Sequence, residues 1–351
     1  MKIFMADFSD WECPELRVNR IREVGAENDS ICLPLDQFQV TGPNGSHFCF
    51  VYPVAGPKVS CILQEFEEPD RVLRRVGLNA VKAMVALHRF EICHGDFTPS
   101  NILLRVSGLD GLPEDRVIQI LGQPKTVNVV TSTGEKPSHP SAPQYLVHPV
   151  DFQSVHHRYL SDEIYIIDCG KSYHVSLPPD DLDIPQNYYS PELILDGQTG
   201  IGSDLWALGC TLFAIRTGRR LFDLFDDDRD DHLYHMVMLL GILPEPWWTS
   251  TWSTREDYFD DRPSSNNRAV KTFEALDEPA EPHEPRSIEE MLDHGLVYIE
   301  SRTGMIPKEV RRRISAEEVT MFADLLGLIL RYQPEERLTA DLAQHHGWFS
   351  M

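Results

Sequence analysis

Several features are scarce or absent in this sequence of 351 residues, and each absence narrows the range of functions. No apolar run approaches the roughly 20 residues that a membrane-spanning helix needs. The start, MKIFMADFSDWE, turns acidic too early for a secretory signal peptide. The seven cysteines are odd in number and form no C-x-x-C pair, which indicates reduced thiols. We therefore expect a soluble protein of the cytoplasm or nucleus.

Positive charge is also scarce. The chain has 32 Lys and Arg against 55 Asp and Glu, a formal net charge of −23. This balance argues against nucleic acid or an anionic membrane as the main partner and favours a basic protein partner. An acidic surface that only aids solubility explains the charge equally well. We expect a monomer.

Hydropathy patterns divide the chain into two lobes of a globular α+β fold. The small lobe spans residues 1–56, where ICLPLDQFQV and HFCFVYPV read as strands around the turn TGPNGS. It also has a strand-like start at MKIF and a helical pattern over 11–24. The large lobe, 57–351, is mainly helical and opens with apolar residues at helical spacing in DRVLRRVGLNAVKAMVALHRF. Two polar, proline-containing stretches, at about 105–160 and 249–310, are expected to be insertions, the first a long insertion or flexible loop.

The stretch HGDFTPSNILL has the spacing of a phosphotransfer catalytic loop. His94, Asp96 and Asn101 match the pattern in which Asp deprotonates the acceptor hydroxyl and Asn holds magnesium. Gly95 stands where Arg is usual, and Thr98 stands where Lys is usual. The same pattern occurs in aminoglycoside-type phosphotransferases, so this stretch alone leaves protein and small-molecule phosphotransferases both open.

Later motifs favour a protein kinase. EIYIIDCGKSY places Asp168 after an apolar strand, as in the D-F-G motif that binds magnesium. Ser190-Pro191-Glu192 and the D-x-W-x-x-G pattern of Asp204 follow, and Arg337 lies in a closing P-x-x-R-x-T-A segment. The chain therefore resembles the eukaryotic-type Ser/Thr protein kinases, because small-molecule phosphotransferases lack the S-P-E and D-x-W-x-x-G elements. The resemblance implies that Glu192 pairs with Arg337 and that Asp204 holds the catalytic-loop backbone.

Within that superfamily the chain resembles the SR-protein kinases, which phosphorylate serines in Arg/Ser-rich proteins. The resemblance rests on TGPNGSHFCFVYPVAGP, on the insertion before D-C-G, and on DDHLYHMVMLLGILP. It implies a bilobal kinase fold, and Gly95 suggests activity without phosphorylation of the activation loop. It also implies docking of Arg-rich peptides near an acidic run whose members are Asp226, Asp227, Asp228, Asp230 and Asp231. A solvated acidic loop is the equally favoured alternative.

The same resemblance implies a site for ATP and Mg²⁺. MKIFMAD resembles the kinase strand that carries the phosphate-binding lysine, here Lys2, with Glu15 as its helix partner and Glu12 less favoured. Asp96 is the expected base, and Asn101 and Asp168 are the expected metal ligands. The segment FCFVYPVAGP resembles the hinge that binds the nucleotide base. The resemblance implies that three of its residues contact the nucleotide: Tyr52, Pro53 and Ala55.

Two interpretations of the function stay open. If Lys2 lies on the lysine-bearing strand, the glycine-rich loop over the phosphates is expected before residue 1, and the sequence contains no G-x-G-x-x-G. Thr98 removes a further cationic contact to phosphate. The chain is then either a Ser/Thr protein kinase that transfers the γ-phosphoryl group of ATP, or a pseudokinase scaffold that binds a basic partner with little or no catalysis.

Overall fold

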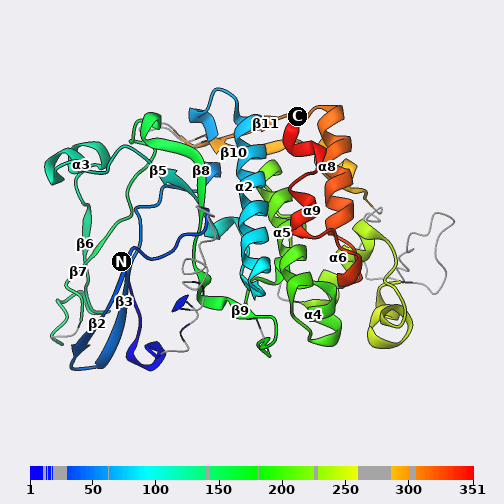
Figure 1. The fold of residues 1–351 in the computed structure, drawn as a ribbon, viewed down its shortest axis with the longest axis horizontal. Helices are drawn as coiled ribbons and strands as arrows, with labels where there is room; N and C mark the ends of the chain where they lie inside the picture. The colour runs from blue at the N-terminus through cyan, green and yellow to red at the C-terminus, as the bar shows by residue number, and fades with distance from the viewer. Residues whose placement is uncertain are drawn as a thin grey trace.

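The computed structural model describes residues 1–10, 13, 15–16, 18, 30–61, 63–139, 142–180, 182–224, 228–259, 286–300 and 306–351. The expected helix over 11–24 lies largely outside these ranges, as does half of the second expected insertion. Glu12, Asp226 and Asp227 also lie outside them. The chain has a small sheet beside its N-terminus and a large, mainly helical body (Figure 1). This confirms the α+β class. No helix in the described ranges is long and apolar enough to cross a membrane.

The small sheet has the strand order β1-β3-β2, with antiparallel pairs throughout. Its strands are β1 (Lys2–Ile3), β2 (Asp36–Gly42) and β3 (Gly45–Val51). Gly42 pairs with Gly45 around a two-residue turn, which confirms the hairpin expected at TGPNGS. Lys2 lies opposite Phe50, whose ring is fully buried. The apolar core under β3 therefore fixes the strand that carries Lys2.

Two short ladders bracket the catalytic loop. β4 (Ile92–Cys93) pairs with β9 (Tyr173–His174), and β5 (Ile102–Val106) pairs with β8 (Leu160–Ile166). The loop joins β4 to β5, while Asp168 is the second residue after β8. Because the partners of β4 and β5 flank residue 168, the loop and Asp168 are brought to the same end of the ladders.

Residues 107–159, which join β5 to β8, have secondary structure of their own. They contain α3 (Glu114–Leu121), β6 (Thr126–Asn128) and β7 (Tyr145–Val147), and the last two pair as antiparallel strands. This segment separates the catalytic loop from Asp168 along the chain. The bounds of the two expected lobes, 1–56 and 57–351, and the assignment of the two stretches as insertions stay predictions.

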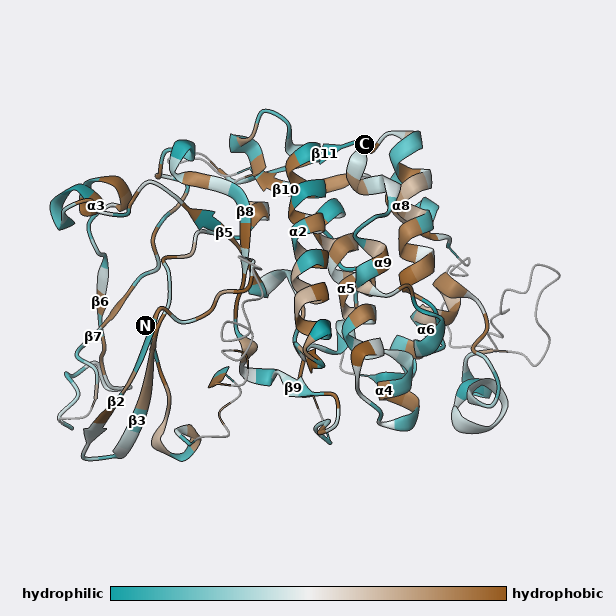
Figure 2. Cartoon of the chain, viewed as in Figure 1, coloured by the Kyte–Doolittle hydropathy of each residue, from teal (hydrophilic) through white to brown (hydrophobic). Residues whose placement is uncertain are grey.

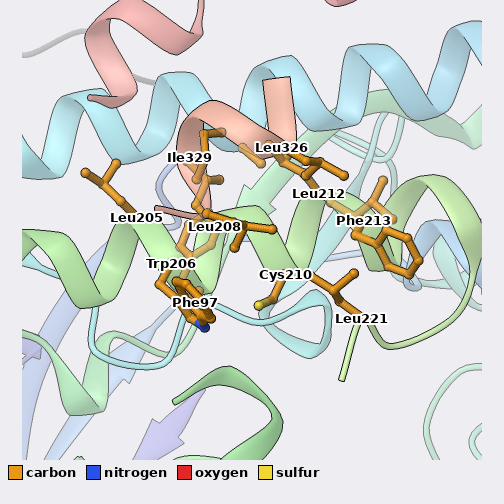
Figure 3. Close-up of a cluster of buried hydrophobic side chains, with 14 of the residues drawn as sticks. Phe97, Leu205, Trp206, Leu208, Cys210, Leu212, Phe213, Leu221, Leu326 and Ile329 are labelled. Atoms are coloured by element: carbon orange, nitrogen blue, oxygen red, sulfur yellow. The ribbon is translucent and has the colours of Figure 1, made fainter. Parts of the chain in front are cut away.

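The helical body is built around α2 (Pro69–Arg89), which packs against α5 (Ile201–Thr217) and β8. Both helices carry many brown, apolar residues in Figure 2. Figure 3 shows the core beside α5, where Phe97 of the catalytic loop lies among buried residues of α5 and of α8 (Ala316–Ile329). The remaining elements are α4 (Pro191–Asp196), α6 (Arg229–Leu240), α7 (Ile288–Asp293), β10 (Leu296–Glu300), β11 (Lys308–Arg312) and α9 (Ala340–Ala343).

Candidate active site

Side chains of helix α5 hold the backbone of the catalytic loop by hydrogen bonds. Asp204 accepts hydrogen bonds from the backbone N–H of His94 at 2.7 Å and of Gly95 at 3.0 Å. Thr211, two turns further along α5, donates to the carbonyl of Phe97 at 2.8 Å. Asp204 thus makes the contacts that the kinase resemblance implies for it. A buried carboxylate that accepts two backbone N–H groups fixes the start of the loop in one conformation.

Gly95 is explained by local geometry. Its φ is +78°, in the left-handed region that favours glycine. A Cβ at this position would lie 2.4 Å from the carbonyl oxygen of Lys171, closer than real Cβ atoms approach other atoms. The missing arginine therefore has a steric reason, which the sequence pattern alone did not reveal.

Asp96 and Asn101 form a tight pair. The Nδ2 group of Asn101 donates to both the backbone carbonyl and Oδ2 of Asp96, each at 2.9 Å. The other carboxylate oxygen, Oδ1 of Asp96, is buried without a partner among the described residues. Burial raises the pKa of Asp96, although the hydrogen bond from Asn101 opposes the shift. The arrangement leaves one carboxylate oxygen able to accept a proton from an incoming hydroxyl.

Lys2 links the small sheet to Asp168, which lies just after β8. Its Nζ lies 2.5 Å from Oε1 of the buried Glu15 and 2.9 Å from Oδ1 of Asp168. Burial alone would lower the pKa of Lys2, but the hydrogen bonds and charges of the two carboxylates raise it. For Asp168 burial acts upward, and Lys2 outweighs it, so the pKa of this carboxyl is lowered. Lys2 and Asp168 are therefore held in their charged forms at neutral pH.

A cavity of about 320 Å³ adjoins these charges. Its wall includes the hinge residues Tyr52, Pro53 and Ala55, together with Lys2, Glu15 and Asp168. The other lining residues are mainly apolar: Met1, Val18, Cys32, Leu33, Pro34, Leu103, Ile167 and Cys169. A slot with apolar walls and a cation–carboxylate group fits a flat base linked to phosphates.

The donor set also fits magnesium. Asn101 donates through Nδ2, so Oδ1 is the acceptor atom left on its side chain. With the carboxylate of Asp168 it offers hard oxygen ligands. Magnesium in phosphotransfer sites is usually held by one or two protein oxygens and by phosphate oxygens of the substrate. No group of three or more His, Cys, Asp or Glu in the described ranges could hold a metal on its own.

A second ion pair lies deeper in the helical body. Arg337 donates to both carboxylate oxygens of Glu192, with each N–O distance 2.7 Å, and both side chains are buried. The guanidinium also donates to the carbonyls of Gly202 and Tyr332, at 2.7 Å and 2.9 Å. The pair expected from the S-P-E and P-x-x-R motifs is thus present and ties α4 to the C-terminal segment.

The acidic run before α6 has local structural roles. The carboxylate of Asp228 accepts from the N–H of Asp230 and caps α6. Asp230 in turn accepts from Trp252 Nε1 at 2.9 Å and from Thr254 Oγ1 at 2.7 Å. The Oδ1 atom of Asp231 lies 3.6 Å from Nε2 of His235. Docking of a basic peptide to this run stays a prediction.

Comparison with known sequences identifies the family. A family model described as protein kinase domain matches residues 155–349, more than half of the chain. The chain therefore belongs to the protein kinase family, and its α+β architecture is that of a bilobal kinase. The match begins after Lys2, Asp96 and Asn101, whose roles stay predictions.

The curated relatives refine the class. Serine/threonine-protein kinase AFC3 of Arabidopsis thaliana is 26% identical over 307 residues, covering 87% of this chain and 64% of the relative. Serine/threonine-protein kinase SRPK of Physarum polycephalum is 25% identical over 329 residues, covering 90% and 70%. Dual specificity protein kinase CLK2 of Homo sapiens is 23% identical over 348 residues, covering 97% and 56%. The resemblance to this group of kinases is confirmed, and the chain spans 64% and 55% of the length of two Arabidopsis relatives.

Proposed function

We propose that this chain is a Ser/Thr protein kinase that transfers the γ-phosphoryl group of ATP to hydroxyl groups of proteins. The observation that carries the proposal is the state of Asp96. Its Oδ2 is held by Asn101, and its buried Oδ1 has no partner among the described residues. A carboxylate in that state, on a loop fixed by Asp204, is suited to accept a proton from a bound hydroxyl.

The residues around Asp96 support the same reaction. Asp96 takes the proton of the acceptor hydroxyl as its oxygen bonds to the γ-phosphorus. The bond from that phosphorus to the β–γ bridging oxygen breaks, and its electron pair leaves on ADP. Lys2 offsets negative charge on the phosphates. Asn101 and Asp168 would hold Mg²⁺, which neutralises phosphate charge when bound.

Basic, Arg/Ser-rich proteins are the substrate class that we propose. The net charge of −23 supports this choice, because it attracts and selects basic sequences. We place the protein in the cytoplasm or nucleus, acting as a monomer. All seven cysteines are free and six of them are buried, which supports a reducing compartment.

Phosphoryl transfer from radiolabelled ATP tests the proposal. The acceptor is an Arg/Ser peptide, and the control enzyme is Asp96→Asn, which keeps the size of the side chain but cannot accept the proton. We expect transfer by the natural chain and a loss of about a hundredfold or more in the variant. Equal background signal from both proteins would overturn the enzyme proposal. Stabilisation by ATP in that case would favour the scaffold interpretation.

A further inference from the structure

The phosphate end of the site is short of positive charge. Thr98, at the position where kinases usually carry lysine, is uncharged and only 4% exposed. Lys2 already contacts two carboxylates, Glu15 and Asp168. Phosphoryl transfer spreads negative charge over the oxygens of the γ-phosphate, so a further cation near Asp96 would stabilise the transition state.

Lys171 is a positively charged residue whose backbone lies against Gly95 of the catalytic loop. It ends the 3₁₀ turn Cys169–Lys171 that follows Asp168. A Cβ built on Gly95, the residue before Asp96, would lie 2.4 Å from the carbonyl oxygen of Lys171 and 3.4 Å from its Cβ. The side chain of Lys171 therefore starts beside the residue that precedes the base. Its charge also acts on Asp96, where it opposes the rise in pKa that burial causes.

Asp183, the ion-pair partner of Lys171, would compete only weakly with a phosphate for its ammonium group. Its Nζ lies 2.7 Å from Oδ2 of Asp183, whose side chain is 90% exposed, while that of Lys171 is 43% exposed. Ion pairs this open to solvent contribute little, because water and salt screen them. A phosphate, with more charge and more acceptor oxygens, can take the ammonium group from Asp183.

Lys58 is a second lysine in contact with the catalytic loop. Its Nζ lies 3.2 Å from Oγ of Ser100, an exposed contact beyond Asp96 in the chain. Its removal takes one charge from the same loop without changing the segment that lies against Gly95. It therefore serves as a matched control for Lys171.

We propose that Lys171 contacts the γ-phosphate of bound ATP and replaces the cation that Thr98 cannot provide. The proposal rests on the kinase function proposed above and assigns a phosphate-binding residue to it. Asp183 is then the resting partner of Lys171, which it leaves when the nucleotide binds.

Nucleotide binding tests this assignment without any measurement of turnover. The affinities of the natural chain for AMP-PNP and for ADP, each with Mg²⁺, are measured by calorimetry and compared with those of Lys171→Met. We expect the natural chain to prefer AMP-PNP, and Lys171→Met to lose about tenfold of that preference through weaker AMP-PNP binding. ADP affinity should stay nearly unchanged, because ADP lacks the γ-phosphate.

Three further variants complete the test. Lys171→Arg should keep the preference for AMP-PNP, Lys58→Met should leave it intact, and Thr98→Lys should restore part of it in the Lys171→Met protein. Equal preference in the natural chain and Lys171→Met would overturn the role of Lys171 while leaving the kinase proposal standing. Absence of binding of either nucleotide to the natural chain would overturn both.

Discussion

At the scale of single residues, the side chains of the candidate site form two hydrogen-bonded groups. Asp96 and Asn101 are hydrogen-bonded, and Lys2 reaches both Glu15 and Asp168, as the kinase motifs imply. These pairs could be predicted because each motif fixes a residue type at a set spacing. The contact of Gly95 with Lys171 could not, since it depends on how two segments far apart in the sequence meet in space.

Gly95 gives a direct test at this scale. Gly95→Ala should lower the free energy of unfolding by about 1–3 kcal/mol, because alanine disfavours the positive φ and its Cβ meets the carbonyl of Lys171. Gly111→Ala is the control, since its φ is +72° and nothing lies within 4 Å of the added Cβ. Denaturant unfolding of both variants separates two costs. Both variants carry the cost of a positive φ, and only Gly95→Ala adds the steric clash with Lys171. A cost no greater at Gly95 than at Gly111 would contradict the steric explanation.

At the scale of elements, local sequence signals predicted individual strands and helices, whereas pairings between distant strands could not be predicted from them. The β2–β3 hairpin follows from a turn sequence, and α2 follows from apolar spacing. The β4–β9 ladder is two residues long on each side and joins distant segments, so no local pattern predicts it. The helix α3 had a readable signal, with Pro113 at its start and Gly122 in a left-handed conformation at its end.

Helix α6 carries a buried histidine that makes the stability of the fold depend on pH. His232 is 0% exposed, and neither ring nitrogen has a partner among the described residues. Burial, with a smaller contribution from His235, lowers the pKa of His232 to about 3. Between that value and the ordinary 6.5, the unfolded chain binds a proton that the folded chain does not. The stability contributed by neutral His232 is therefore lost as the pH falls below 6.5.

The expected size of this effect can be measured. At pH 5.5, one unit below the ordinary pKa, His232 should cost about 1.4 kcal/mol of stability relative to pH 7.5. Denaturant unfolding at both pH values is compared for the natural chain and His232→Leu, with His345→Leu on an exposed residue as control. The variant at 232 should lose less stability on acidification. An identical loss in all three proteins would contradict the assignment.

At the scale of the whole molecule, composition predicted the sign of the charge but not its distribution. A cavity of about 610 Å³ beside α6 is lined by Arg219, Arg220 and Arg286, and Asp223 is the one acidic residue that lines it in the part of the chain that the structure describes. A basic peptide would be repelled from this cavity. Net charge therefore favours a basic partner at long range without locating where it docks.

Long-range attraction between the acidic protein and basic peptides should make substrate choice depend on salt concentration. The specificity constant kcat/KM for an Arg/Ser peptide should fall about five- to tenfold as salt rises from 0.05 to 0.5 M, because screening shortens the reach of the charge. The control peptide has every Arg replaced by Gln, and its kcat/KM should change little over the same range. A parallel salt response of the two peptides would mean that the acidic surface does not select basic substrates. Its contribution would then be confined to keeping the protein in solution.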